Sequence, residues 1–525
     1  MAKPRMMFYH DGRHPLIYMY EPPMQKEEYE QAVDELVGTP IEAIMFCLGD
    51  GRTVLHDTEV GELWGAPNEQ WSHLIFRRAH QNAKHLIEAG NDPLRIVCER
   101  AHAKGFLLYP TLLVQQGSGE RGEDTRCSNF RFDNKHLEIG ARGDLDPTTP
   151  GFDCLDFKHE EVRQERFALI EETLENYAVD GFELQMYYTP HYFHPDEVEA
   201  GCAIMTDWIG RVYAAVKKSG AQRELVVRVP NSLENCLSAG LDLRAWIDQG
   251  IIDVVVAEDR IDGASFAQSA DFRPLVEAVQ GSQCRLQAVL NSHVDSDRLS
   301  EAPIEMVRAT ATNYWSQGID GLYLAQWFSN WPYQDSFYGK MRELADPEIM
   351  AAKDKYYFVP TLAVRSANPA EQVAQRLPHK LEVDKPVTVQ FSISDDLPRW
   401  AAVGRVHEVL LRARVMETTE LDRLSFKLNG VELPEALMRK INRMYMMNSP
   451  RARVTGYWFI FRLDADHWPQ CGANEFAVML QHRDPLALPE IALRDVELEI
   501  KYLMGKNFHR SFVDADLGAF DVMVE

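Results

Sequence analysis

Short apolar runs alternate with amphipathic segments along the first 345 residues of the chain. Runs of this length that alternate with helical patterns predict strands joined by helices. The eight predicted strands span 15–20, 41–48, 106–114, 181–186, 224–229, 252–257, 285–290 and 319–324. The helices between and after them are expected near 26–37, 73–103, 159–177, 198–219, 243–249, 272–279, 304–317 and 334–344. Eight such repeats predict an α/β fold, a closed (β/α)8 TIM barrel.

The main alternative to the barrel is an open, doubly wound sheet. Such a sheet usually has a glycine-rich turn after its first strand, where it binds phosphate groups. The first predicted strand runs instead into Glu21-Pro22-Pro23, which is no such turn. The pattern therefore favours the closed barrel.

The hydrophobic period changes to two after about residue 357. Strands with alternating apolar and polar positions are expected at 387–393, 406–415, 423–428, 453–462, 475–480 and 494–502. Asn429-Gly430 between two such runs predicts a tight hairpin. This part is typical of an antiparallel β-sandwich, with a helical insertion near 434–445. We expect a barrel over 1–350, a linker over 351–385 and an accessory sandwich over 386–525.

Charge and cysteine content narrow the class of partner. The 525 residues include 80 acidic and 55 basic side chains, a net charge of −25. So acidic a surface argues against nucleic-acid and anionic-membrane partners, and no apolar run is long enough to span a bilayer. No signal-peptide core lies near the N-terminus, which predicts a cytoplasmic protein; a trimmed signal is the alternative. The eight cysteines are scattered, so neither a metal site nor a cofactor is expected; a homo-oligomer is left open.

Polar and aromatic side chains gather where the predicted strands end. The carboxyl ends of barrel strands carry the chemistry in this fold. Sugars need hydrogen-bonding groups and aromatic faces, so this rim predicts a carbohydrate substrate. The candidate substrate-binding residues are Asp50, Tyr109, Gln185, Tyr188, His191, Arg228, Asn231, Asp259, Asn291, His293, Tyr323 and Trp327.

Glu183 and Glu258 are the predicted catalytic pair. Glycoside hydrolysis needs one carboxyl that donates a proton and another that acts as base or nucleophile. Strand alternation turns Glu183 toward the barrel axis. Glu258 follows a strongly apolar strand, which favours a raised pKa and therefore the acid role for this carboxyl. Alternation does not decide between Glu258 and Asp259. Glu183 could instead pair with Arg228 in a structural polar layer.

Several segments resemble one known family. They are residues 128–134, 155–157, 161–163 and 177–184, together with 240–242, Trp246, 250–253 and 318–323. In these, over roughly 100–330, the chain is similar to the family-10-like glycosyl hydrolases. The resemblance implies a barrel fold and a carbohydrate substrate, without naming one bond.

The chain departs from this pattern at two strands. Relatives often have Asp where this chain has Gln185, and the seventh predicted strand ends in Asn291-Ser292-His293 rather than Glu. The usual retaining pair is therefore not visible, which favours inversion. Two alternatives to a hydrolase stay open: a carbohydrate-binding barrel without activity, and a lyase or isomerase that uses His191 or His293 with Tyr187. A pocket with two carboxyls favours hydrolysis, whereas one carboxyl with His and Tyr favours elimination.

Overall fold

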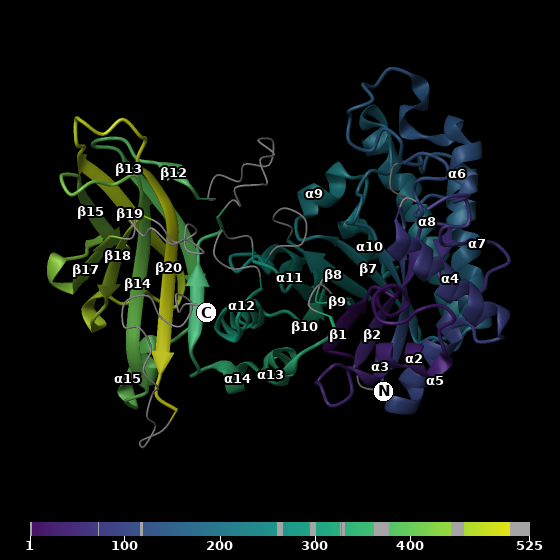
Figure 1. Ribbon diagram of the computed structural model, residues 1–525, viewed down its shortest axis with the longest axis horizontal. Helices are drawn as coiled ribbons and strands as arrows, with labels where there is room; N and C mark the ends of the chain where they lie inside the picture. Colours follow the sequence, from purple (N-terminus) through teal and green to yellow (C-terminus); the bar gives the residue numbers. More distant parts are fainter. Residues whose placement is uncertain are drawn as a thin grey trace. The chain divides into compact units, whose positions relative to one another are not determined.

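The computed structural model describes residues 3–71, 73–115, 119–259, 266–294, 301–325, 327, 331–361, 377–442 and 456–504. The chain divides into two compact units (Figure 1). The first comprises the described residues within Met1–Asp259, Asp271–Asn291 and Gln317–Ala345. The second comprises those within Arg260–Ala270, Ser292–Ser316 and Asp346–Glu525.

The first unit is a closed barrel of eight parallel strands. Each strand pairs with the next along the chain, and β1 pairs with both β10 and β2, which closes the sheet. The strands are β1 Met6–His10, β2 Ala43–Asp50, β5 Leu107–Leu113, β6 Gly181–Gln185, β7 Glu224–Pro230, β8 Val254–Glu258, β9 Arg285–Leu290 and β10 Gly321–Leu324. Two short strands, β3 Thr53–Val54 and β4 Glu62–Leu63, extend the sheet beyond β2. The predicted TIM barrel is confirmed.

The first predicted strand, 15–20, is wrong. The barrel begins earlier, at β1, whose five residues are all buried. Residues His14–Tyr18 form the short helix α1, in which Pro15 occupies the first turn, where its missing N–H costs nothing. Tyr18 is 55% exposed, whereas an inner barrel strand is covered on both faces.

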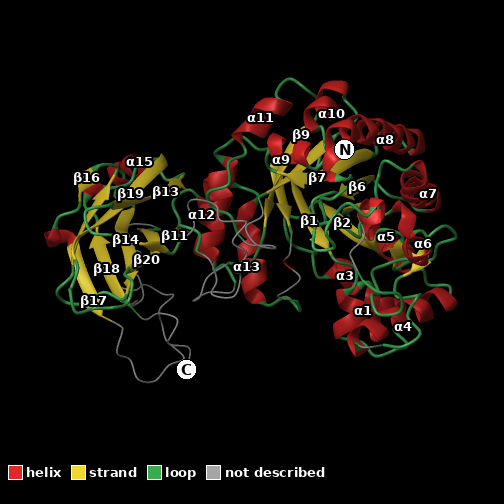
Figure 2. Ribbon diagram, turned by 90° about the horizontal axis from the view of Figure 1, so that it is seen from above, coloured by secondary structure: helices red, strands yellow, loops and turns green. Residues whose placement is uncertain are grey.

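Helices surround the barrel strands (Figure 2). The expected helix at 26–37 is two shorter ones, α2 and α3, and the expected helical segment at 73–103 is α4 followed by α5. The helices of this unit are α1 His14–Tyr18, α2 Lys26–Tyr29, α3 Gln31–Asp34, α4 Leu74–Glu88, α5 Pro93–Lys104, α6 Asn129–Asp133, α7 Glu160–Asn176, α8 Val198–Ser219, α9 Leu233–Ser238, α10 Leu243–Gln249, α11 Arg273–Val279 and α13 Asp335–Leu344.

Side chains from alternate strand positions fill the interior of the barrel. Met7, Met45, Val226, Val256 and Val289 belong to one buried apolar cluster. Strand alternation places polar side chains on the same inner surface. Among them are Thr111, Glu183, Arg228 and Glu258, all 0% exposed. The barrel core is therefore apolar with a polar layer toward the carboxyl ends of β6, β7 and β8.

The second unit contains two antiparallel sheets. One sheet has the order β11-β20-β14-β18-β17, with β12 also paired to β20, and the other has the order β13-β19-β15-β16. The strands are β11 Lys355–Phe358, β12 His379–Lys380, β13 Pro386–Ile393, β14 Val406–Met416, β15 Arg423–Leu428, β16 Val431–Glu432, β17 Met438–Asn442, β18 Tyr457–Arg462, β19 Gly472–His482 and β20 Ala492–Tyr502. Its helices are α12 Ile304–Trp315, α14 Pro347–Met350 and α15 Leu397–Ala402.

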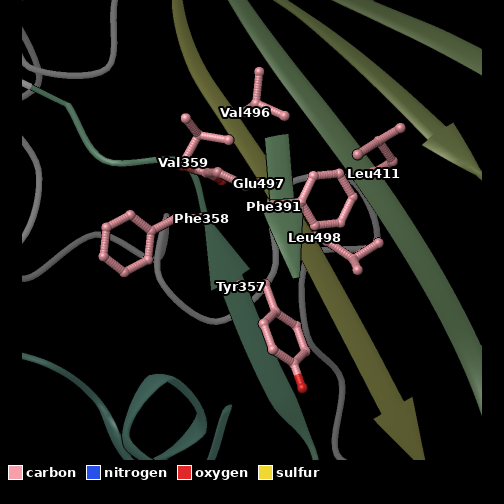
Figure 3. Close-up of a pocket in the computed structure, with 8 residues that line it drawn as sticks. All are labelled: Tyr357, Phe358, Val359, Phe391, Leu411, Val496, Glu497 and Leu498. Atoms are coloured by element: carbon pink, nitrogen blue, oxygen red, sulfur yellow. The ribbon is translucent and has the colours of Figure 1, made fainter. Parts of the chain in front are cut away.

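Apolar side chains of both sheets form one core in this unit. Phe391, Phe426 and Phe476 of the smaller sheet belong to the same cluster as Leu411 and Leu498 of the larger sheet. Figure 3 shows part of it, with Tyr357 and Phe358 leaving β11 on opposite sides. The crevice drawn there holds about 0 Å³ of free space, so it is packed core rather than a ligand site.

Two details of this unit differ from the sequence prediction. The expected helical insertion at 434–445 is a single 3-10 turn, Glu435–Leu437, followed by β17; residues 443–445 lie outside the described part. Within the range expected as a linker, β11 and β12 both pair with β20. Short edge strands of this kind carry too little hydrophobic pattern to be separated from a loop by sequence alone.

Candidate functional site

A pocket of about 220 Å³ lies at the carboxyl-terminal mouth of the barrel. It is formed by the loops after β1, β5 and β6, by the end of β7 and by α1 and α4. Its lining residues are Tyr9, Asp11, Arg13, His14, Ile17, Tyr18, Phe76, Leu113, Arg126, Gln185, Tyr188 and Arg228. This is the end of the barrel at which TIM-barrel enzymes hold their substrates.

A glycine determines the course of the loop after β1. Gly12 has a positive φ of 75°, and a Cβ placed there would lie 2.7 Å from the carbonyl oxygen of Cys47. Its N–H donates to Nδ1 of His10, and its carbonyl accepts from the Tyr29 hydroxyl, at 3.0 Å each. This tight turn carries the flanking Asp11 and Arg13 into the pocket wall.

Arg13 binds two carboxylates at once. Its Nε donates to Asp11 Oδ1 at 3.0 Å, and its Nη1 donates to Asp50 Oδ2 at 3.1 Å. Trp64 Nε1 donates to the same Asp50 oxygen at 3.2 Å. Burial opposes ionisation of Asp11, but the Arg13 and His14 charges prevail and lower its pKa to about 2. Asp11 is therefore a fixed anion at neutral pH.

His14 forms a dyad with Asp11. Its Nδ1 lies 3.2 Å from Asp11 Oδ2, and only 6% of the residue is exposed. Burial lowers the pKa of His14 to about 4, with the opposing charge of Asp11 as the second factor. The imidazole is thus neutral at pH 7. A neutral imidazole keeps one ring nitrogen that can accept a proton.

Arg228 and Glu258 form a fully buried ion pair at the ends of β7 and β8. Nη2 of Arg228 lies 2.8 Å from Glu258 Oε2, and Nε donates to the same oxygen at 2.9 Å. The guanidinium also lies over the rings of Tyr323 and Tyr9, at 5.0 and 5.5 Å from their centroids. Arg228 lines the pocket, whereas Glu258 does not. The structure also decides which of two neighbouring carboxyls enters the barrel: it is Glu258 and not Asp259.

Glu183 lies in the same polar layer, on β6. It accepts hydrogen bonds from the Thr111 hydroxyl and, at 2.9 Å, from the Tyr323 hydroxyl. Burial raises the pKa of Glu183 to about 6, against the opposing influence of Arg228 and the two hydrogen bonds. Like Glu258, it has no exposed surface and does not line the pocket.

The pocket collects three of the predicted substrate-binding residues. Gln185, Tyr188 and Arg228 line it. Asp50 does not line the pocket, but it accepts a hydrogen bond from the lining residue Arg13. Gln185 Oε1 accepts the backbone N–H groups of Tyr187 and Tyr188 at 2.7 and 3.1 Å, which fixes the loop after β6.

Three predicted residues are placed differently from expectation. Tyr109 lies near the opposite end of the barrel, where its hydroxyl donates to Glu224 at the start of β7, because the strand begins only two residues before it. Tyr323 is enclosed in the barrel, where its hydroxyl donates a hydrogen bond to Glu183. Trp327 is 1% exposed and donates to the Leu290 carbonyl, so it is a packing residue and not an open platform.

The remaining predicted residues do not line the pocket. His191 is half-buried and its carbonyl accepts from Gln115, and burial lowers its pKa. The Asn231 N–H donates to the Glu258 carbonyl at 3.1 Å. Asn291 is buried, Asp259 half-buried and His293 exposed.

The sequence-based prediction missed the segment Tyr9–His14 and Arg126. The segment was missed because the first strand was placed nine residues too late. The buried run Met6–His10 followed by Asp11-Gly12-Arg13 is a strand-then-turn signal that could have revealed it. Arg126 lies in a long insertion, whose course no periodic pattern predicts.

One cluster within the described residues has metal-ligand composition. Ligand atoms of Asp144, His194 and Asp196 lie within 4.8 Å of one another. However, Arg142 Nη2 lies 3.0 Å from Asp144, and the Asp196 N–H donates to Nδ1 of His194. A guanidinium already neutralises this carboxylate, so the cluster does not fit a cation.

Comparison with known proteins gives matches among solved structures only. No family model matches the chain, and no curated protein matches it. The resemblance to family-10-like glycosyl hydrolases therefore stays a prediction. Within the described residues, no helix combines the length and apolar character needed to cross a membrane.

Three of the matching solved structures are carbohydrate-acting enzymes. The glycoside hydrolase domain of PgaB from Bordetella bronchiseptica is 12% identical, with a TM-score of 0.42 over 65% of this chain and 99% of that one. An α-L-fucosidase of Paenibacillus thiaminolyticus is 11% identical, with a TM-score of 0.43 over 68% and 51%. A cycloisomaltooligosaccharide glucanotransferase of Paenibacillus sp. is 10% identical, with a TM-score of 0.36 over 94% and 57%.

This chain spans little more than half of the fucosidase and glucanotransferase chains. With TM-scores below 0.5, none of these likenesses assigns an activity or a substrate to it.

Proposed function

We propose that the protein is a glycoside hydrolase that binds a sugar in the barrel-mouth pocket and cleaves its glycosidic bond with the carboxyl pair Glu183 and Glu258. One observation carries the proposal: Arg228 lines the pocket and is ion-paired with Glu258, and its charge also acts on the pKa of Glu183. Burial holds the pKa of Glu183 at about 6, close to the pH at which a proton donor works best.

The two carboxyls have different environments, as the reaction requires. Glu258 is paired with a guanidinium, which suits it to the role of the base rather than to the acid role expected from the sequence. Glu183 has only hydroxyl donors, from Thr111 and Tyr323, and is suited to deliver a proton to the leaving oxygen. Both are enclosed, so a bound sugar has to draw the Arg228 side chain toward its own hydroxyls before either carboxyl can reach it.

The test is a screen of aryl glycosides and polysaccharides with the wild type, Glu183→Gln and Glu258→Gln. Loss of a positioned general acid or base costs about 10²–10⁴-fold in turnover. Glu183→Gln should slow substrates with poor leaving groups far more than activated aryl glycosides, which need little protonation. Glu258→Gln should slow both kinds alike.

Glu224→Gln is the matched control. Glu224 is also a buried barrel carboxyl, bound by Arg285 at 2.7 Å and by Tyr109, but at the opposite end of the barrel. Its loss should reduce stability and leave turnover per folded molecule unchanged. If both pocket-side variants cleave a confirmed substrate at wild-type rates, the carboxyl pair is wrong.

A lyase is the second candidate, and the Asp11–His14 dyad favours it. The pocket wall itself holds one carboxylate, Asp11, together with His14 and the phenols of Tyr9 and Tyr188. The neutral imidazole of His14 would remove a proton next to a sugar carboxylate. The electron pair left by that C–H bond forms the double bond as the neighbouring C–O bond breaks, and the departing oxygen takes a proton from a phenol. Ultraviolet absorbance of an unsaturated product distinguishes this reaction from hydrolysis.

A further inference from the structure

Three guanidinium groups and a single carboxylate belong to the pocket lining. The guanidinium groups are those of Arg13, Arg126 and Arg228, and the carboxylate is that of Asp11. Two of the three already have carboxylate partners within the chain. Arg13 binds Asp11 and Asp50, and Arg228 binds Glu258.

Arg126 differs from the other two. Nη1 of its half-buried side chain donates to the Tyr188 hydroxyl at 3.3 Å. Among the ion pairs of the described residues, none joins Arg126 to an acidic side chain. In a chain with 80 acidic and only 55 basic residues, an arginine in a pocket without an acidic partner is notable.

The backbone around Arg126 is held in place. Its N–H donates to Asp124 Oδ1 at 2.8 Å, and its carbonyl accepts from the Thr53 hydroxyl at 3.2 Å. The neighbouring Thr125 carbonyl accepts the Gly65 N–H at 3.1 Å. These bonds fix the backbone of the loop before a ligand binds, which lowers the entropy cost of binding.

We propose that the pocket binds a sugar that carries a carboxylate, a uronic acid residue, and that Arg126 together with Tyr188 binds this carboxylate. The inference rests on the proposed function, in that it takes the pocket to be a sugar site. A guanidinium presents paired N–H donors that match the two oxygens of a carboxylate, and such charge-assisted bonds are roughly twice as strong as neutral ones.

The rest of the lining suits a sugar ring rather than a bare anion. Gln185 and His14 offer polar contacts, and the rings of Tyr18 and Phe76 offer faces for C–H stacking. Pockets for drug-sized ligands begin at about 300 Å³. The volume of about 220 Å³ therefore fits one small ring.

Calorimetric titration with matched sugars tests the proposal. The probes are glucuronate against glucose, galacturonate against galactose, and inorganic phosphate alone, at low ionic strength. Because a hydrogen bond to a charged group contributes about one decade or more of affinity, the wild type should bind each uronate at least tenfold tighter than its neutral partner. Added salt should weaken uronate binding and leave neutral-sugar binding unchanged.

Arg126→Gln should reduce the uronate preference to within about twofold while neutral-sugar affinity stays unchanged. Tyr188→Phe should reduce it less, and it serves as the second variant if Arg126→Gln does not fold. Arg77→Gln is the matched control, because it removes an exposed positive charge on α4, next to the lining residue Phe76, without touching the pocket. It should retain the full preference.

Equal binding of acidic and neutral sugars would overturn the proposal, and so would phosphate binding as tightly as a uronate, which would make the site a general anion site. A preference for uronates without cleavage of any glycosidic bond would support the uronate proposal and contradict the proposed hydrolase function. If none of the sugars binds, both the uronate proposal and the proposed function as a glycoside hydrolase are wrong.

Discussion

The Arg228 guanidinium and the Glu258 carboxylate lie 2.8 Å apart and are both fully buried, Arg228 in the pocket lining and Glu258 behind it. Removing one member of such a pair leaves the other charge uncompensated, which costs about 3–5 kcal/mol. We therefore expect Arg228→Met to lower the free energy of unfolding by that amount in urea denaturation.

The double variant Arg228→Met/Glu258→Met is the control for that prediction. It removes both charges, so it should recover a large part of the loss, because apolar replacements of buried ion pairs are often close to neutral. A double variant less stable than the single one would show that the pair is not the source of the effect.

Glu183 makes stability depend on pH. Its pKa is about 6 in the folded protein and 4.5 in the reference state. The unfolded chain therefore loses this proton first as pH rises, and the fold loses about 2 kcal/mol between roughly pH 4.5 and pH 6. Glu183→Gln cannot titrate and should lack this contribution.

Urea midpoints of the wild type and Glu183→Gln between pH 4 and 8 measure the difference. The wild type should lose stability relative to the variant as pH rises through 6. If the two curves stay parallel, Glu183 does not titrate in this range.

Gly12 should tolerate no side chain. Its positive φ strains any other residue by about 1–2 kcal/mol, and a Cβ would also approach the Cys47 carbonyl. Gly38→Ala is the matched control, with a φ of 84° and no atom within 4 Å of the added Cβ. Gly12→Ala should therefore cost clearly more stability than Gly38→Ala and should also weaken ligand binding. Equal losses of stability in the two variants would mean that backbone strain alone, and not the approach to the Cys47 carbonyl, destabilises Gly12→Ala.

Asp11→Asn should weaken the pocket wall. The change removes the charge that Arg13 and His14 share, and loss of a charged hydrogen-bond partner costs about 1.5–3 kcal/mol. Thermal denaturation and ligand titration measure both effects. Asp248→Asn, which removes an exposed partner of Arg244 on α10, should change stability by less than about 1 kcal/mol. Comparable losses in the two variants would contradict a special role of Asp11.

Local pattern was sufficient for most of the fold. Strands β2 and β5 to β10 lie where buried apolar runs predict them, since an inner barrel strand is covered on both faces and reads as continuous hydrophobic sequence. The hairpin at Asn429-Gly430 likewise follows from its turn residues, with Asn429 at a φ of 51° and Gly430 at 80°. The first strand was misplaced because one short apolar run, 15–20, competes with another, Met6–His10, and only barrel closure selects between them.

The sequence by itself determined the barrel, the sandwich and the inward direction of Glu183. Those depend on periodicity, which is a local property of the chain. Only the tertiary structure decided that Glu258 pairs with Arg228, that Asp11, Arg13 and His14 form one wall of the pocket, and that Arg126 joins Tyr188. Those contacts connect strands and loops far apart in sequence, and their geometry depends on barrel closure and on turns that no hydrophobic period encodes.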